Sequence, residues 1–255
     1  MKRFTHLEFD DSSGSQKPSG NGESIRDEAF FQRRAILCFL HSDFELALRN
    51  YSRALELNSS FFEGWAGQIR MLIELGEYPE AMIWADKALE SFPEHPELLA
   101  SKAVACLRDA KFEKAKAFSD NSISKDNVGP RVWLGRAEVL LQSKSRVADT
   151  CLSKALSLKT EESKLIKLEA GRILKLYKRY STAIEYLQEA VHYFPKSALA
   201  WYELGTCQSR LGFSQAVTSL EQCLQLHPDF TEAKEALKNA KDGFLGRLFR
   251  RLGLG

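Results

Sequence analysis

Small residues recur along this chain with a period of about 34 positions, and they dominate its hydrophobic pattern. The first set contains six alanines that stand 33 to 35 residues apart: Ala47, Ala81, Ala115, Ala148, Ala183 and Ala216. Seven positions after each alanine comes a second small residue, in the order Ala54, Ala88, Ser122, Ala155, Ala190 and Cys223. Residues seven apart lie about two turns apart on one face of an α-helix. Because only a small side chain fits where two helix axes approach closely, the pattern predicts one helical hairpin repeated six times.

Bulky residues and helix-ending residues follow the same period. An aromatic or bulky residue opens five of the hairpins: Phe31, Trp65, Leu99, Trp133 and Trp201. A proline or short polar residue is expected to close the second helix of each hairpin: Ser59, Pro93, Asn127, Thr160, Pro195 and Pro228. Gly76 and Gly212 stand at the corner between two helices, where glycine tolerates a tight turn. Each repeat therefore contains two helices and two short turns.

Two stretches carry the pattern most fully. They are Trp65, Ile69, Gly76, Tyr78, Ala81, Ala88 and Pro93, and then Trp201, Leu204, Gly205, Gly212, Ala216 and Pro228. At these positions the chain resembles the tetratricopeptide repeat (TPR) family. The resemblance implies an all-α fold, a right-handed α-solenoid superhelix of about six TPR helical hairpins over residues 26–228. The expected hairpins span 28–61, 62–95, 96–129, 130–162, 163–197 and 198–229.

The two ends of the chain differ from the repeats. Residues 1–25 are rich in turn formers and polar residues, which predicts a disordered arm. Residues 229–242 have one apolar helical stripe, made of Phe230, Ala233, Ala236, Leu237 and Ala240. The last hairpin of a solenoid would otherwise expose its apolar face, so we expect a capping helix here.

Residues 243–255 form a basic amphipathic pattern. One side of the expected helix is apolar, with Phe244, Leu245, Leu248, Phe249 and Leu252. The other side carries Arg247, Arg250 and Arg251, and the segment contains no acidic residue. Three interpretations stay open: this tail lies on an anionic membrane surface, it binds a groove of a partner protein, or it completes the capping helix.

Composition and motifs argue against several functional classes. The 36 basic and 34 acidic residues leave a net charge of +2 without a basic cluster in the repeats, so we expect no nucleic-acid partner. Phosphate-binding loops, nucleophile motifs and metal-ligand spacings do not occur, and we expect neither catalysis nor a cofactor nor a metal. The five cysteines form no C-x-x-C pair, and no signal peptide is recognised. We therefore expect a cytoplasmic protein, with peripheral contact at the inner face of a membrane as one alternative.

The resemblance also indicates where a ligand binds, because the first helix of each TPR hairpin lines the concave face. The candidate partner-binding residues on that face are Arg70, Ile73, Val104, Arg108, Glu138, Arg172, Lys175, Tyr202 and Arg210. This mixture suits a peptide or helix with apolar anchors and some acidic residues. Chaperone-binding members of the family use a lysine and an asparagine to open a carboxylate clamp, where this chain has Gln32 and Ile36. We therefore do not expect it to bind heat-shock-protein tails.

These observations together predict a non-catalytic scaffold or adaptor for protein–protein interaction. Its partner is a protein or peptide bound in the concave groove, and the tail is a candidate for recruitment to a membrane surface. Two alternatives remain: a chaperone or assembly factor for a secretion or envelope complex, and a regulatory subunit or sensor that controls a partner enzyme.

Overall fold

The computed structural model describes residues 26–126, 128–160 and 163–251, with side chains as far as Gly243. Twelve of its helices form six hairpins. The first helices are α1 (Glu28–His41), α3 (Phe62–Glu74), α5 (Pro96–Arg108), α7 (Pro130–Gln142), α9 (Ser163–Leu176) and α11 (Ala198–Leu211). The second helices are α2 (Phe44–Leu57), α4 (Tyr78–Ser91), α6 (Phe112–Ile123), α8 (Val147–Ser157), α10 (Tyr180–Tyr193) and α12 (Gln215–Leu226). The described residues contain no strand, and the expected all-α repeat solenoid is confirmed. The expected disordered arm, residues 1–25, lies outside the described residues.

The repeated small residues lie where the helices pack. All twelve positions of the two small-residue sets are at most 2% exposed, from Ala47 to Cys223. A Cβ atom added at Gly171 of α9 would lie 2.6 Å from Leu187 of α10, and one at Gly205 would lie 2.7 Å from Leu220. A larger side chain at these contacts would force the facing leucine or its helix to shift, so small residues allow the two helices of a hairpin to pack closely.

The corner between the two helices of each hairpin has the same backbone conformation in all six repeats. A residue with positive φ stands there every 34 positions: Ser42, Gly76, Ala110, Lys144, Lys178 and Gly212, with φ between 55° and 79°. Only two of these residues are glycine, the type that adopts this region without a steric cost. The repeat geometry therefore imposes the left-handed conformation on the other four side chains.

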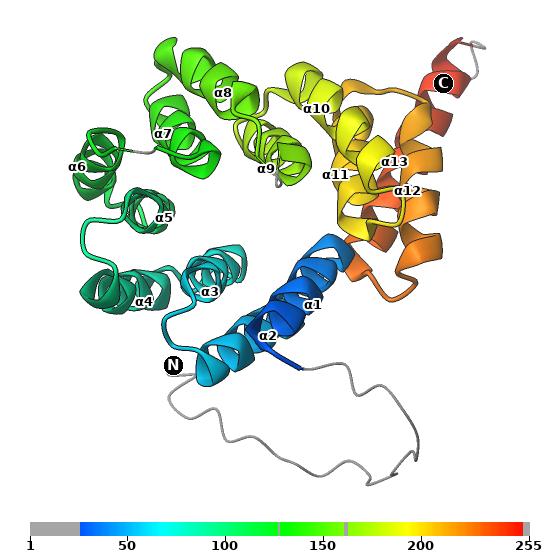
Figure 1. Ribbon diagram of the computed structural model, residues 1–255. Helices are drawn as coiled ribbons and strands as arrows, with labels where there is room; N and C mark the ends of the chain where they lie inside the picture. Colours follow the sequence, from blue (N-terminus) through cyan, green and yellow to red (C-terminus); the bar gives the residue numbers. More distant parts are fainter. Residues whose placement is uncertain (1–25, 127, 161–162, 252–255) are drawn as a thin grey trace, which may run out of the picture.

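The six hairpins curve into a ring, with the first helices on the inside and the second helices outside (Figure 1). The first hairpin returns to the sixth. The Ser197 hydroxyl, just before α11, donates a hydrogen bond to the Leu40 carbonyl of α1 at 2.7 Å. Beside it, the His41 Nε2 atom lies 3.1 Å from the Leu226 carbonyl at the end of α12. Helices far apart in the sequence thereby close the superhelix. Stacking of neighbouring hairpins alone would not require this contact.

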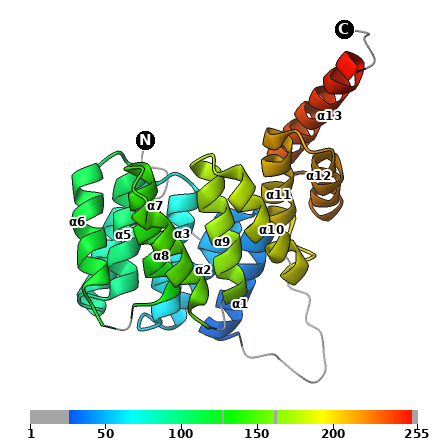
Figure 2. The same cartoon turned by 90° about the horizontal axis from the view of Figure 1, so that it is seen from above.

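The last helix, α13 (Thr231–Arg251), covers the open end of the sixth hairpin. Phe230, Ala233 and Ala240 of the expected stripe are buried, and Ala236 and Leu237 are half-buried. Two segments were expected, a capping helix over 229–242 and a tail over 243–255, yet a single helix runs through both as far as Arg251. Its C-terminal part projects from the ring (Figure 2). The side chains of the tail, from Phe244 onward, lie outside the described ones.

Candidate functional site

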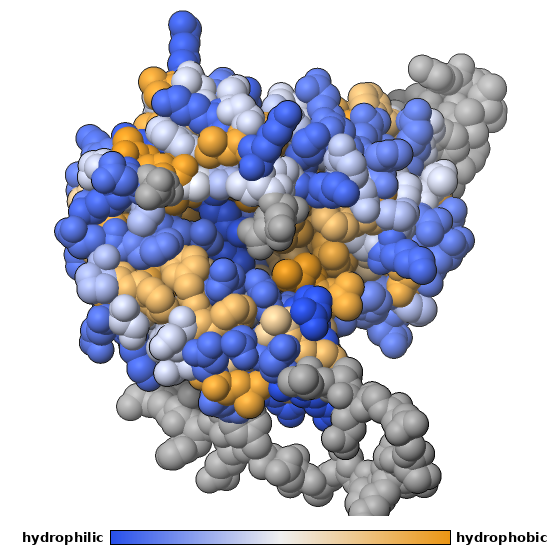
Figure 3. Space-filling model, in the orientation of Figure 1, coloured by the Kyte–Doolittle hydropathy of each residue, from blue (hydrophilic) through white to orange (hydrophobic). Residues whose placement is uncertain are grey.

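A cavity of about 270 Å³ opens at the centre of the ring. All six first helices contribute to its wall, and Tyr51 joins them from α2. Its apolar lining includes Ile36, Phe39, Ile73, Val104, Leu134, Leu165, Ile173 and Leu176. Figure 3 shows the hollow on the face of the ring that is seen in Figure 1, with hydrophobic and hydrophilic residues around it. The cavity is slightly smaller than the usual ligand pocket of about 300–1,000 Å³, so it suits one or two inserted side chains.

Ion pairs connect successive inner helices around this cavity. Each arginine reaches a glutamate of a later hairpin: Arg70 pairs with Glu97 at 2.8 Å, Arg108 with Glu138, Arg131 with Glu169 at 3.3 Å, and Arg172 with Glu203 at 3.0 Å. Lys175 also contacts Glu203. The inner wall thus carries nearly balanced charge. Arg70, Arg108 and Arg172, three of the four arginines that the sequence offers to a ligand, already have acidic partners within the chain.

Arg172 is the centre of the network. Its Nη1 and Nη2 atoms each donate to the Glu74 carboxylate at 2.7 Å, across the ring from α9 to α3. The guanidinium also lies 5.5 Å from the Phe39 ring centroid and 5.6 Å from that of Phe44. Burial alone would lower the pKa of Arg172, but Glu74 and Glu203 outweigh it and raise that pKa. Arg172 therefore stays charged and ties three hairpins together.

Like Glu138 with 3%, Glu203 is almost completely buried in this network, with only 4% of its side chain exposed. Burial alone would raise its pKa, but Lys175 and Arg172 hold the pKa below its usual value. Arg108 is the basic counterpart: burial alone would lower its pKa, but Glu138 raises that pKa above its usual value. Both groups are therefore ionised at neutral pH, and their pairing fixes the inner surfaces of neighbouring hairpins relative to one another.

Seven of the nine residues expected on the concave face line the cavity: Arg70, Ile73, Val104, Arg108, Glu138, Arg172 and Lys175. The remaining two lie elsewhere. Tyr202 packs against Phe230 beside α13, with the ring centroids 4.7 Å apart, and Arg210 is exposed near the end of α11. Sequence reasoning missed Glu203, Arg131 and Glu169. A usable signal was present, since each arginine has a glutamate 27 to 38 residues further along.

Hairpins that stack through small residues, with a cavity along their first helices, define an α-solenoid repeat protein. The tetratricopeptide repeat family model matches residues 41–96 and 178–212, and a second tetratricopeptide repeat model matches residues 199–229. The chain therefore contains tetratricopeptide repeats at these positions.

Individual relatives are more distant. The Hsp70-Hsp90 organizing protein of Triticum aestivum is 25% identical over 195 residues, which cover 74% of this chain and 33% of that protein. The SGT1 homolog of Oryza sativa subsp. japonica is 35% identical over 86 residues, covering 34% of this chain and 23% of that protein. The chain thus spans a quarter to a third of these curated relatives. A chain of the APC/C hetero-tetramer Cut9-Hcn1 shares the fold, with a TM-score of 0.54 and 16% identity over 86% of this chain and 44% of that one.

Proposed function

We propose that this protein is a non-catalytic adaptor that holds a segment of a partner protein in the groove of the inner helices. The observation that supports this most directly is the central cavity, whose wall combines apolar side chains with ion pairs. An apolar anchor of the partner enters between Ile73, Val104 and Leu134, and the polar parts of the partner lie along the charged rim.

The ion pairs also indicate which chemical groups of a partner this groove favours. An acidic group of a ligand must displace an internal glutamate before it can bind one of these arginines. Arg108 is the more accessible candidate, since 27% of its side chain is exposed, against 16% for Arg172, which has two glutamate partners. Apolar anchoring therefore contributes most of the affinity, and an acidic residue adds selectivity at Arg108.

The test uses peptides selected on the full-length protein from a phage-displayed random library. We expect enriched sequences to contain an aromatic or aliphatic anchor with an acid nearby. Leu176→Glu places a charge on the cavity wall, at a residue that is 46% exposed. It should weaken the selected peptides at least about tenfold, because the bound peptide would cover this charge without giving it a partner.

The matched control is Ile83→Glu on the outer helix α4, at a residue that is 67% exposed. This variant should bind the selected peptides as the wild type does. Equal affinity of wild type and Leu176→Glu would place the binding surface outside the cavity and contradict the proposal.

The C-terminal tail supports a second part of the proposal, recruitment to a membrane surface. The α13 backbone continues to Arg251 and projects from the ring, and its last residues carry three arginines and no acid. No described helix is long and apolar enough to cross a membrane. A surface contact through the tail remains compatible with this geometry.

Flotation with phosphatidylserine-containing vesicles tests the tail. The full chain should float with vesicles that contain one third phosphatidylserine and stay behind with pure phosphatidylcholine. A chain ending at Asp242 should lose flotation and retain the selected peptides. Equal flotation of both chains would contradict the membrane role, while loss of the peptides would assign the tail to partner binding.

A chaperone co-factor or assembly factor is the second candidate, and the wheat relative favours it, since that protein is named for organizing Hsp70 and Hsp90. The groove of this chain has Ile36 in the cavity wall, where the clamp of chaperone-binding relatives needs an asparagine. We expect C-terminal peptides of Hsp70 and Hsp90 to bind more weakly than the selected apolar peptides. Tighter binding of the chaperone peptides in a fluorescence-anisotropy titration would reverse this order.

A further inference from the structure

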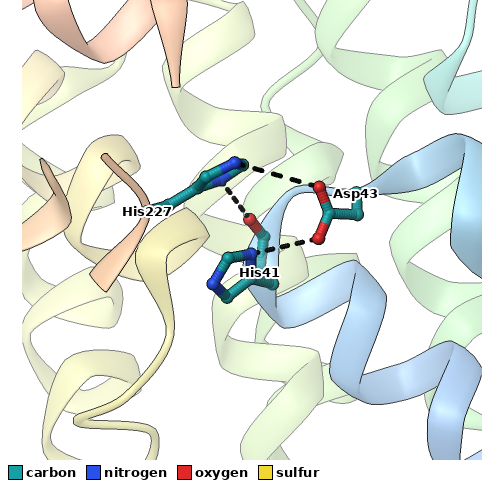
Figure 4. A group of neighbouring side chains, drawn as sticks. All are labelled: His41, Asp43 and His227. Atoms are coloured by element: carbon teal, nitrogen blue, oxygen red, sulfur yellow. Dashed lines mark hydrogen bonds and ion pairs between the residues drawn. The ribbon is translucent and has the colours of Figure 1, made fainter. Parts of the chain in front are cut away.

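Two histidines and an aspartate meet where the ring closes (Figure 4). His41 is the last residue of α1, Asp43 precedes α2, and His227 follows α12. The Nδ1 atom of His41 lies 3.0 Å from one Asp43 carboxylate oxygen, and the Nε2 atom of His227 lies 4.0 Å from the other. The two imidazole rings are 4.4 Å apart between centroids. The first and last hairpins thus present three possible ligand atoms to one another.

In each histidine, the ring nitrogen that does not face Asp43 determines the tautomer. His41 Nε2 lies 3.1 Å from the Leu226 carbonyl oxygen, and His227 Nδ1 lies 3.0 Å from the His41 carbonyl oxygen. A carbonyl oxygen only accepts a hydrogen bond, so both of these nitrogens carry the hydrogen. In the neutral rings, the remaining nitrogens therefore carry lone pairs, and both lone pairs face the Asp43 carboxylate.

Lone pairs and a carboxylate repel one another unless a positive charge lies between them. Either protons on the rings or a cation can supply that charge. Metal-bound histidines characteristically donate their other ring N–H to a backbone carbonyl or a carboxylate, and both histidines do so here. The hydrogen bonds to Leu226 and His41 thus orient each ring as a ligand and select the tautomer that binds a metal.

The spacing suits a small transition-metal ion. All three ligand atoms lie within 4.8 Å of one another. Zinc–nitrogen and zinc–oxygen bonds of about 2.0–2.2 Å place neighbouring ligand atoms of a tetrahedral site about 3.3–3.5 Å apart, inside the observed range. Imidazole ligands favour Zn²⁺ and its neighbours over Mg²⁺ or Ca²⁺. The side chains are 40% exposed in His41, 39% in Asp43 and 20% in His227, which gives the ion access and a water molecule room as fourth ligand.

We propose that His41, Asp43 and His227 bind a Zn²⁺-class divalent transition-metal ion that joins the first hairpin to the sixth. Neither hairpin holds the complete ligand set, because His41 and Asp43 come from one and His227 from the other. The ion therefore binds the closed ring more tightly than an open one, and by linkage it stabilises closure.

Isothermal titration of Zn²⁺ into the full-length protein, stripped beforehand with a chelator, tests the proposal. We expect one high-affinity ion per chain. Asp43→Asn and His227→Gln remove one ligand from each side, and each should weaken binding at least about tenfold. Co²⁺ in place of Zn²⁺ should give the intense visible absorption of tetrahedral coordination in wild type, and both variants should lose it.

Two controls separate this site from other ligands. His192→Gln changes an exposed histidine of α10, and Cys38→Ser removes the one cysteine among the five that is not buried. Both should bind Zn²⁺ as wild type does. Far-UV circular dichroism shows whether each variant keeps its helices, so that a loss of binding is not a loss of fold.

Hydrogen exchange gives a readout that does not depend on affinity. Zn²⁺ should slow exchange of the amides at the ends of α1 and α12 in wild type and leave Asp43→Asn unchanged. The proposal is overturned if Zn²⁺ binding does not saturate at one ion, or if folded Asp43→Asn and His227→Gln bind it as well as His192→Gln. The cluster is then held by protons and hydrogen bonds alone.

Discussion

Two kinds of contact hold the hairpins in the ring, and they use different chemistry. Stacking contacts join helices that are neighbours in the sequence, within a hairpin and between successive hairpins. They use small apolar residues such as Ala81 and Ala183, which are fully buried. Closing contacts join hairpins that are not neighbours, and the hydrogen bonds and ion pairs among them have no counterpart in the repeated pattern. They include the Ser197–Leu40 hydrogen bond, the His41–His227 contacts and the ion pair between Arg172 and Glu74.

The stacking contacts build the row of hairpins, and the closing contacts join its two ends. Stacking contacts repeat, so every hairpin packs on the next by the same apolar burial, which water does not replace. A closing hydrogen bond exchanges for one to water and contributes only about 0.5–1.5 kcal/mol net. We therefore expect the ring to open between α1 and α11 before any stacked pair separates, and this opening is the simplest route for a partner segment to enter the cavity.

The Arg172→Ala substitution should give the largest effect. It leaves Glu74 and the buried Glu203 without their guanidinium partner, and breaking a buried ion pair costs about 3–5 kcal/mol. Urea unfolding followed by circular dichroism measures the loss. The control is Arg179→Ala, which removes an exposed partner of Asp149 and should cost at most about 1 kcal/mol. Equal losses in the two variants would mean that closing contacts stabilise no more than surface pairs do.

Acidification should weaken the same contact by a smaller amount. The pKa of Glu203 is lower in the folded chain than its usual value of 4.5, so the stability it contributes is present above that value. This stability is lost as the pH falls through the lowered folded pKa. Unfolding midpoints measured between pH 7 and pH 3 should fall less steeply for Glu203→Gln than for wild type. Parallel curves would remove Glu203 from the acid response.

Overpacking a stacking contact should have the next largest effect on stability. Ala81→Leu inserts a larger side chain at a fully buried position of α4 and should cost about 1–3 kcal/mol. Ala117→Leu, at an exposed position of α6, is the control and should stay within about 0.5 kcal/mol of wild type. A neutral Ala81→Leu would show that neighbouring hairpins tolerate a change of spacing.

Loss of the Ser197 hydroxyl should be milder and local. It removes a closing hydrogen bond to Leu40 and the cap of α11 on the Ala200 amide, at a cost of about 1 kcal/mol. Hydrogen exchange at the end of α1 should accelerate in Ser197→Ala. The control is Ser214→Ala, since Ser214 precedes α12 and its side chain caps no amide there. Faster exchange throughout the stacked hairpins would mean that closing and stacking are not separable.

The smallest effect should be a gain. Ala110 has φ of 56°, which costs energy for any residue with a Cβ atom. Ala110→Gly should stabilise the protein by about 0.5 kcal/mol, whereas Ala117→Gly inside α6 should destabilise it by about 0.5–1 kcal/mol. Unfolding midpoints of the two variants should therefore shift in opposite directions. Shifts of the same sign would mean that the corner is not strained.

The sequence was sufficient to predict the hairpins but not the contacts that close the ring. Repetition made the hairpins visible, because Ala81 and its counterparts report one packing requirement six times. Each closing contact occurs only once in the chain, so no repeated pattern reveals it. His41 and His227 are separated by 186 positions, and Glu74 and Arg172 by 98, so no local pattern relates them. Seven residues of the cavity wall, Glu138 among them, were predictable from the family resemblance. Which glutamate each arginine reaches depends on how far neighbouring helices turn relative to each other.

A closed ring also restricts how this chain can change its length. Open repeat arrays tolerate the gain or loss of a unit, since each unit touches only its neighbours. Here the first unit must return to the sixth, with Ser197 facing Leu40. Duplicating or deleting one hairpin would rotate and shift one end relative to the other, and the polar partners would no longer meet. For this protein, the number of repeats is therefore tied to the closing contacts, and a chain with one unit more or fewer would need different contacts to shut the ring.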